Sequence, residues 1–152
     1  MHVSDEDLEL YVLARMPSDQ LSFVEPHIAN CNSCASRVSE VAELAHRTLR
    51  LSRQLEEYGG VERRREHRIP CEDPGEMQTF SPFSPIRIPV QLADVSRNGL
   101  RVRTPQPVYR GTIVQVRTRG ALVLGEVRYC VTSGAKFDVG IQIQDVVPKH
   151  NT

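Results

Sequence analysis

The spacing of apolar residues divides the chain into two parts with different predicted structures. Up to residue 58, apolar residues recur every three or four positions, which is the spacing of amphipathic helices. From residue 86 they recur at every second position, which is the spacing of half-buried strands. We therefore expect an α+β protein with three helices followed by five or six short antiparallel strands.

The first two helices are predicted from a start signal and from prolines. Ser4 and Asp7 have the spacing of a capping box, with Asp in place of Glu. A second helix is expected after Pro17, and Pro26 is expected to kink it. The apolar faces of the two helices comprise Leu8, Tyr11, Val12, Leu21, Val24 and Ile28.

A third, long helix is predicted from about Ser33 to Tyr58, and Gly59 and Gly60 stop it. It carries a heptad-like seam with spacings of three and four, made of Val41, Leu44, Thr48, Leu51, Leu55 and Tyr58. Two interpretations of this seam stay open. It packs on the first two helices or on the β-rich part, or it forms a parallel homodimer in which Thr48 fixes the register.

The second part of the chain predicts a small barrel or sandwich. Residues 71–85 hold three prolines and a glycine and are expected to form a turn-rich loop. Alternating patterns then predict strands at 86–92, 100–104, 113–117, 122–131 and 137–143. Pro89 suggests that the first of these strands lies at an edge or starts late, and Gly125 suggests a bulge.

Charge separates the same two parts. The chain has no net charge, yet residues 1–60 carry a net charge of −5 and residues 61–152 carry +5. This split favours two units with different partners. No apolar run is long enough to span a membrane and no signal peptide is evident, so we expect a cytoplasmic protein. Its four cysteines are then expected to be thiols or metal ligands.

Three residues of the second helix and the following turn have the spacing of a metal site. His27 and Cys31 lie four positions apart and share a helical face, and Cys34 follows one turn later. Tetrahedral Zn²⁺ needs one more ligand. His2 is the best candidate, and His46 is a weaker one.

This H-x24-H-x3-C-x2-C pattern resembles the zinc-binding anti-sigma domain over roughly residues 1–50. The resemblance implies a structural zinc ion held by His2, His27, Cys31 and Cys34. It also implies a sigma factor as a possible protein partner, bound by the acidic helical face.

Four arginines fall within residues 63–68, directly after the predicted long helix. Arg64 and Arg68 have R-x-x-x-R spacing, and Asp94, Ser96 and Gly99 form a D-x-S-x-x-G turn further along the chain. The two motifs, in this order and before a β-rich tail, resemble the PilZ domain. The resemblance implies a six-stranded β-barrel that binds the second messenger cyclic di-GMP.

The resemblance also assigns roles to the two motifs. Arg64 and Arg68, with Arg63 as an additional contact, would hold guanine edges and phosphates through bidentate hydrogen bonds. Asp94 would accept hydrogen bonds from guanine N1–H and N2–H. Ser96 would bind a phosphate or the base, and Gly99 would allow close approach of the backbone.

Together these patterns predict a messenger-controlled regulator with three segments. Residues 1–58 form the helical zinc-binding domain, residues 59–70 the arginine linker and residues 71–148 the barrel. We find no catalytic constellation and expect no enzyme. One alternative is a zinc-dependent anti-sigma protein or interaction scaffold with a degenerate PilZ domain. The other is a nucleic-acid-binding protein that uses the basic barrel face. The few aromatic residues and the acidic half of the chain argue against it.

Overall fold

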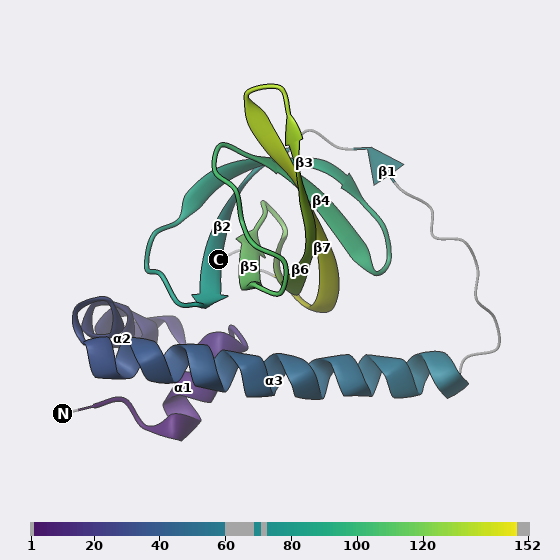
Figure 1. The fold of residues 1–152 in the computed structure, drawn as a ribbon. Coiled ribbons are helices and arrows are strands. Elements are labelled where there is room, and N and C mark those ends of the chain that lie inside the picture. Colours follow the sequence, from purple (N-terminus) through teal and green to yellow (C-terminus); the bar gives the residue numbers. More distant parts are fainter. Residues whose placement is uncertain (1, 60–68, 71–72, 149–152) are drawn as a thin grey trace.

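The computed structural model describes residues 2–59, 69–70 and 73–148. Three helices come first, followed by strands (Figure 1). The helices are α1 (Asp5–Val12), α2 (Ser18–Asn30) and α3 (Asn32–Gly59). The strands are β1 (Ile69–Pro70), β2 (Pro74–Ser81), β3 (Ile88–Val95), β4 (Gly99–Thr104), β5 (Ile113–Arg117), β6 (Ala121–Ser133) and β7 (Lys136–Pro148).

Six antiparallel strands close into a barrel. The strand order is β1-β3-β2-β5-β6-β7-β4, and β4 pairs back with β3. The two-residue strand β1 adds to the outside of β3. Closure pairs both edges of the six-stranded sheet, so the α+β class and the six-stranded barrel predicted above are confirmed. The barrel core is aliphatic and is centred on Met77, Val102, Val114, Val116, Val127 and Val139.

The predicted loop over residues 71–85 is wrong, because residues 74–81 form strand β2. Pro74 is the first residue of this strand, a position where a missing N–H is tolerated. Gly75 is needed for close packing, since a Cβ atom there would lie 2.8 Å from the carbonyl oxygen of Arg117. The two residues that argued against regular structure therefore fit the start of a strand.

Other local predictions are confirmed. Ser4 caps α1 by accepting a hydrogen bond from the backbone N–H of Asp7 at 3.2 Å. Pro89 is the second residue of β3, so this strand starts late as expected. Gly125 lies at a register shift between β6 and β7. Helix α2 continues through Pro26 to Asn30.

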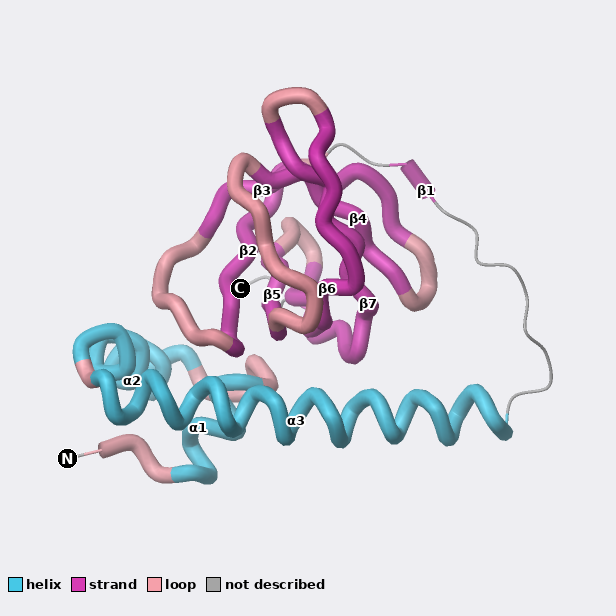
Figure 2. The backbone as a smooth tube through the Cα atoms, in the orientation of Figure 1, coloured by secondary structure: helices cyan, strands magenta, loops and turns pink. Residues whose placement is uncertain are grey.

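Helix α3 runs beneath the barrel, with α1 and α2 packed along its N-terminal half (Figures 1 and 2). Its buried stripe is Cys34, Val38, Ala42 and His46. Leu44 and Leu51 of the predicted seam are 61% and 54% exposed. Packing of these two residues on the helices or the barrel is therefore excluded. No described helix combines the length and the apolar character needed to cross a membrane.

The helices and the barrel share a core cluster. Tyr11 of α1 lies 5.3 Å from Phe80 at the end of β2, measured between ring centroids, and Phe83 completes the aromatic group. Ile113 of β5 belongs to the same cluster. All described residues of β5 except Arg117 are buried, because the helices cover the strand face that points away from the barrel interior.

Candidate functional site

The turn between β3 and β4 presents the D-x-S-x-x-G motif. Ser96 donates its backbone N–H to the carbonyl of Gly99 at 2.7 Å. Its hydroxyl accepts the backbone N–H of Gly99 at 3.1 Å. A Cβ atom at Gly99 would lie 3.3 Å from that hydroxyl, so glycine keeps this turn tight. The neighbouring Asn98 carbonyl accepts the backbone N–H of Ile143, which ties the turn to β7.

Asp94 is held in place by an arginine of the adjacent strand. The Oδ2 atom of Asp94 accepts a hydrogen bond from Nε of Arg101 at 2.8 Å, and it forms an ion pair with Nη2 of the same residue at 2.7 Å. Arg101 also faces Asp138, which accepts a hydrogen bond from Arg103 at 3.0 Å. Two arginines and two carboxylates thus alternate on the outer face of β3, β4 and β7.

Arg101, Arg103 and Asp138 were not among the predicted site residues. The sequence did carry a signal for the two arginines, since both alternate with the buried Leu100, Val102 and Thr104. What the alternation does not give is the register that sets Asp94 opposite Arg101 and Arg103 opposite Asp138.

The predicted arginines Arg63, Arg64 and Arg68 lie outside the described residues. Strand β1 begins directly after them. Ile69 pairs with Val95 and Pro70 pairs with Asp94. The chain that follows the R-x-x-x-R motif is therefore paired with the same two residues that open the D-x-S-x-x-G turn.

The four predicted metal ligands converge in space. One ligand atom from each of His2, His27, Cys31 and Cys34 lies within 4.8 Å of the others. Nδ1 of His2 lies 3.5 Å from both Cys31 Sγ and Cys34 Sγ. Tetrahedral Zn²⁺ with bonds of about 2.0–2.1 Å to nitrogen and about 2.3 Å to sulfur places such atoms about 3.5 Å apart.

The donor chemistry of this cluster suits a metal ion. The Nε2 atom of His27 is buried and has no hydrogen-bond partner. A hydrogen bond from the backbone N–H of Cys34 is the main cause that lowers the pKa of Cys31, which favours the thiolate form that binds metals. His46, the weaker candidate, is absent from the cluster and is buried against the barrel.

A polar contact joins α3 to β7. His46 Nδ1 donates a hydrogen bond to Oε1 of Gln144, and both side chains are buried. Beside them Arg50 pairs with Glu126 at 2.7 Å. Burial lowers the pKa of His46, so the neutral ring is favoured here. Gln144 faces the helix because β7 has one extra residue at the register shift, where Leu124 pairs with Asp145 and Gly125 pairs with Ile143.

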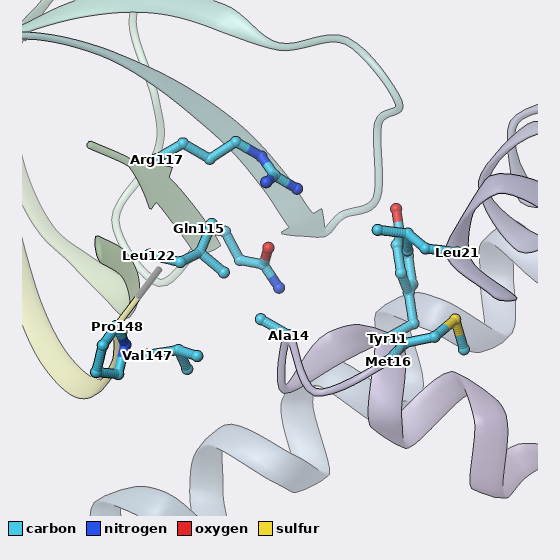
Figure 3. A pocket seen from close by; sticks show the side chains of 9 residues that line it. All are labelled: Tyr11, Ala14, Met16, Leu21, Gln115, Arg117, Leu122, Val147 and Pro148. Carbon is cyan, nitrogen blue, oxygen red and sulfur yellow. The ribbon is translucent and has the colours of Figure 1, made fainter. Parts of the chain in front are cut away.

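A second polar contact borders a cavity of about 160 Å³ between the helices and the barrel (Figure 3). Gln115 of β5 donates its side-chain amide to the carbonyl of Val12, at the end of α1. Tyr11, Met16 and Leu21 line the helical side. Burial raises the pKa of Tyr11 to about 12, so its hydroxyl stays protonated. These contacts could not be predicted from the sequence, because Gln115 and Gln144 are polar residues among the apolar residues of their strands, a pattern typical of solvent-facing positions.

The closed barrel and its D-x-S-x-x-G turn define a small antiparallel β-barrel protein. A family model for the PilZ domain matches residues 62–151, more than half of the chain. The chain therefore belongs to the PilZ family, whose members are receptors of cyclic di-GMP. The matched range leaves the helical residues before it outside the family model.

No curated protein matches the chain. Among solved structures, the inhibitor of motility from Bacillus subtilis (MotI/DgrA) is similar, with a TM-score of 0.43 and 13% sequence identity. The match covers 57% of this chain and 44% of that protein, so the similarity spans less than half of the other protein's length.

Proposed function

We propose that this protein is a cyclic di-GMP-binding regulator whose ligand is held between the arginine motif and the β3–β4 turn. The pairing of β1 with β3 is the observation that carries the proposal. It brings the chain beside Asp94 only two residues after Arg68. Arginine forks suit phosphates and the O6/N7 edge of guanine, and a carboxylate suits the donors of its N1/N2 edge.

Within this site, we assign a separate role in binding to each group of residues. Arg101 fixes Oδ2 of Asp94, which orients the carboxylate before the ligand arrives. Ser96 and Gly99 keep the turn closed, so little conformational entropy is lost on binding. Arg63, Arg64 and Arg68 supply the positive charge that two phosphates require.

Isothermal titration calorimetry with cyclic di-GMP, and with cyclic di-AMP as the control ligand, tests this proposal. We expect guanine-specific binding. Arg68→Ala should weaken it by about tenfold or more, the cost of a lost charged hydrogen-bond partner. Arg119→Ala, at an exposed arginine in the β5–β6 turn, should bind like wild type. If wild-type protein binds neither dinucleotide, the barrel serves as a scaffold and the proposal is wrong.

We further propose that His2, His27, Cys31 and Cys34 hold a structural zinc ion. The orphaned Nε2 of His27 and the 3.5 Å spacing of His2 from both sulfur atoms support it. When bound, the ion cross-links the segment before α1 to the α2–α3 junction.

Zinc analysis of the purified protein tests the ligand set. Wild-type protein should contain stoichiometric zinc, and His27→Ala and Cys34→Ser should lose most of it. Cys130→Ser is the matched control, because Cys130 is a free cysteine of the barrel. A His2→Ala protein that keeps stoichiometric zinc would remove His2 from the ligand set while leaving the other three residues in place.

The helical part is proposed to pass the signal to a protein partner, with a sigma factor as the candidate. The first turn of α1 is acidic, with Asp5, Glu6 and Asp7. Strand β7 connects the β3–β4 turn, where the ligand is proposed to bind, with the helical part. Ile143 is bonded to Asn98 of the turn, and the next two residues, Gln144 and Asp145, contact His46 and Arg15. A two-hybrid screen against the sigma factors of the host, with Glu6→Lys as the variant, tests the partner.

Helix α3 is proposed to form a homodimer through the exposed seam. Leu44 and Leu51 are largely exposed, and Leu55 and Tyr58 continue the same spacing in the sequence. Light scattering after size exclusion should report a dimer for wild type and a monomer for Leu51→Glu. A monomeric wild type at micromolar concentration would contradict the homodimer.

A further inference from the structure

Four residues from four strands form one row across the outer face of the barrel. Asp94 of β3 pairs with Arg101 of β4, Arg101 pairs with Gly140 of β7, and Gly140 pairs with Tyr129 of β6. Neighbouring strands lie about 4.8 Å apart, so the row extends about 14 Å from the carboxylate to the tyrosine. It starts at the residue proposed to bind guanine.

The ring of Tyr129 lies over Gly140. A Cβ atom at Gly140 would overlap the Cδ2, Cε2 and Cζ atoms of this ring. Glycine is therefore required for the ring to lie down on the sheet in this way. The tyrosine side chain leans along the row toward Arg101, yet Tyr129 remains 41% exposed, so part of the ring is open to a ligand.

An unused acceptor lies nearby on the same face. Gln142 follows Gly140 by two positions on β7 and pairs with Gly99, which ends the β3–β4 turn. Its Oε1 atom is buried and has no hydrogen-bond partner. A buried amide oxygen without a partner is costly, and the N1–H and N2–H donors of a guanine would satisfy it.

We propose that Tyr129 is a base-stacking platform that sets the affinity for cyclic di-GMP, with Gln142 as an acceptor for the same base. This inference rests on the function proposed above and extends its site across β4 and β7. The aromatic ring offers its face to a purine, and the glycine beneath it removes any side chain that would lift the ring. Arg101 lies between the platform and Asp94, so the ligand would cover a fixed cation.

Calorimetry on matched variants tests the platform. Stacking of one base on an aromatic side chain is worth enough for Tyr129→Ala to raise the Kd for cyclic di-GMP by about fivefold or more. Tyr129→Phe should keep wild-type affinity, because stacking needs the ring and not the hydroxyl. Phe23→Ala is the control, since Phe23 of α2 is 80% exposed and lies on the helical part. Gln142→Leu should also weaken binding of cyclic di-GMP, because it removes the acceptor for the guanine N1–H and N2–H donors.

Fluorescence gives a second readout. The chain contains no tryptophan, so Tyr129→Trp introduces a single tryptophan at the platform, whose emission can be excited apart from that of the remaining tyrosines. Its emission should be quenched when cyclic di-GMP is added, whereas Phe23→Trp should show no change. Unaltered affinity of Tyr129→Ala together with intact wild-type binding would overturn the platform alone. Absence of binding by wild-type protein would overturn both the platform and the proposed function.

Discussion

At the scale of single residues, Gly140 is under a steric constraint that can be measured. Because a Cβ atom would overlap the ring of Tyr129, we expect Gly140→Ala to lower the free energy of unfolding by about 1–3 kcal/mol, the usual cost of overpacking. Urea denaturation of the protein measures the loss. In a Tyr129→Ala background the same change should cost much less, because the obstructing ring is gone.

A second glycine, Gly125, is the control for this double-mutant cycle of Gly140 and Tyr129. A Cβ atom at Gly125 would lie 2.6 Å from the backbone oxygen of Gln142. Backbone cannot move aside as a side chain can, so Gly125→Ala should be destabilising in both backgrounds. Equal costs of Gly140→Ala with and without Tyr129 would contradict the ring packing described above.

His46 gives the protein a predicted pH dependence. Burial lowers its pKa in the folded state, while an unfolded histidine titrates near about 6.5. Between these two values the unfolded chain binds the additional proton. The contribution of His46 is thus fully present above about pH 6.5 and is lost as the pH falls below it. The groups that face the ring are Gln144, Glu126, Arg50 and Asp145.

The measurement compares melting temperatures of wild type and His46→Gln from about pH 7.5 to about pH 5.5, which spans the titration of a free histidine. Wild type should lose more stability over this range than the variant. Both proteins retain the same His2 and His27, so acid loss of any bound zinc affects them equally. Parallel curves for the two proteins would show that His46 does not titrate on unfolding in this range.

At the scale of elements, the end of β2 joins the helices to the barrel. Phe80 is 1% exposed and contacts both Tyr11 and Phe83. We expect Phe80→Ala to cost about 3–5 kcal/mol, because it leaves a cavity between α1 and the barrel. Phe23→Ala, at a largely exposed phenylalanine of α2, should change stability by less than about 0.5 kcal/mol. Chemical denaturation followed by circular dichroism measures both.

Local patterns predicted elements better than they predicted contacts between elements. Alternation located β3 to β7, and the Ser4 cap located the start of α1. Strand β2 was missed because Pro74 and Gly75 were counted as breakers, although each suits its place at the strand start. On α3, attention to large apolar residues selected the Leu44 and Leu51 seam. The buried stripe instead uses small residues and a histidine, which allow close approach of α1 and the barrel.

The candidate sites differ in the same way, because residues near in sequence could be predicted and contacts between strands could not. Spacing along one helix and the following turn identified His27, Cys31 and Cys34, because helix geometry brings ligands near in sequence together. The resemblance to the zinc-binding anti-sigma domain supported His2 as the fourth ligand, although His2 is distant in sequence. The row from Asp94 to Tyr129 has no such signal. It depends on the register of four strands and on two bulges, where β3 and β6 each gain a residue. Register of this kind follows from closure of the whole barrel, which no local window contains.

At the scale of the whole molecule, the two proposed sites are connected in two ways. The helices and the barrel share the core cluster around Tyr11 and Phe80, and strand β7 contacts both the β3–β4 turn and helix α3. If the zinc cluster positions α1 to α3, and α3 holds Gln144 of β7, then zinc and cyclic di-GMP should be thermodynamically coupled. We predict that removing zinc with a chelator weakens cyclic di-GMP binding by about fivefold or more, the lower end of typical coupling between sites. Calorimetry on zinc-loaded and zinc-stripped protein measures this factor.

Thermodynamic linkage requires a reciprocal effect, so cyclic di-GMP must increase the affinity for zinc by the same factor. Competition with a chromogenic chelator, with and without the dinucleotide, measures the reverse effect. Gln144→Ala should reduce the factor in both directions while leaving each site intact, since Gln144 belongs to neither. Arg119→Ala is the control, at an exposed arginine of the β5–β6 turn. A factor of one in wild type would mean that the helices and the barrel act independently, and that the contact of α3 with β7 serves stability alone.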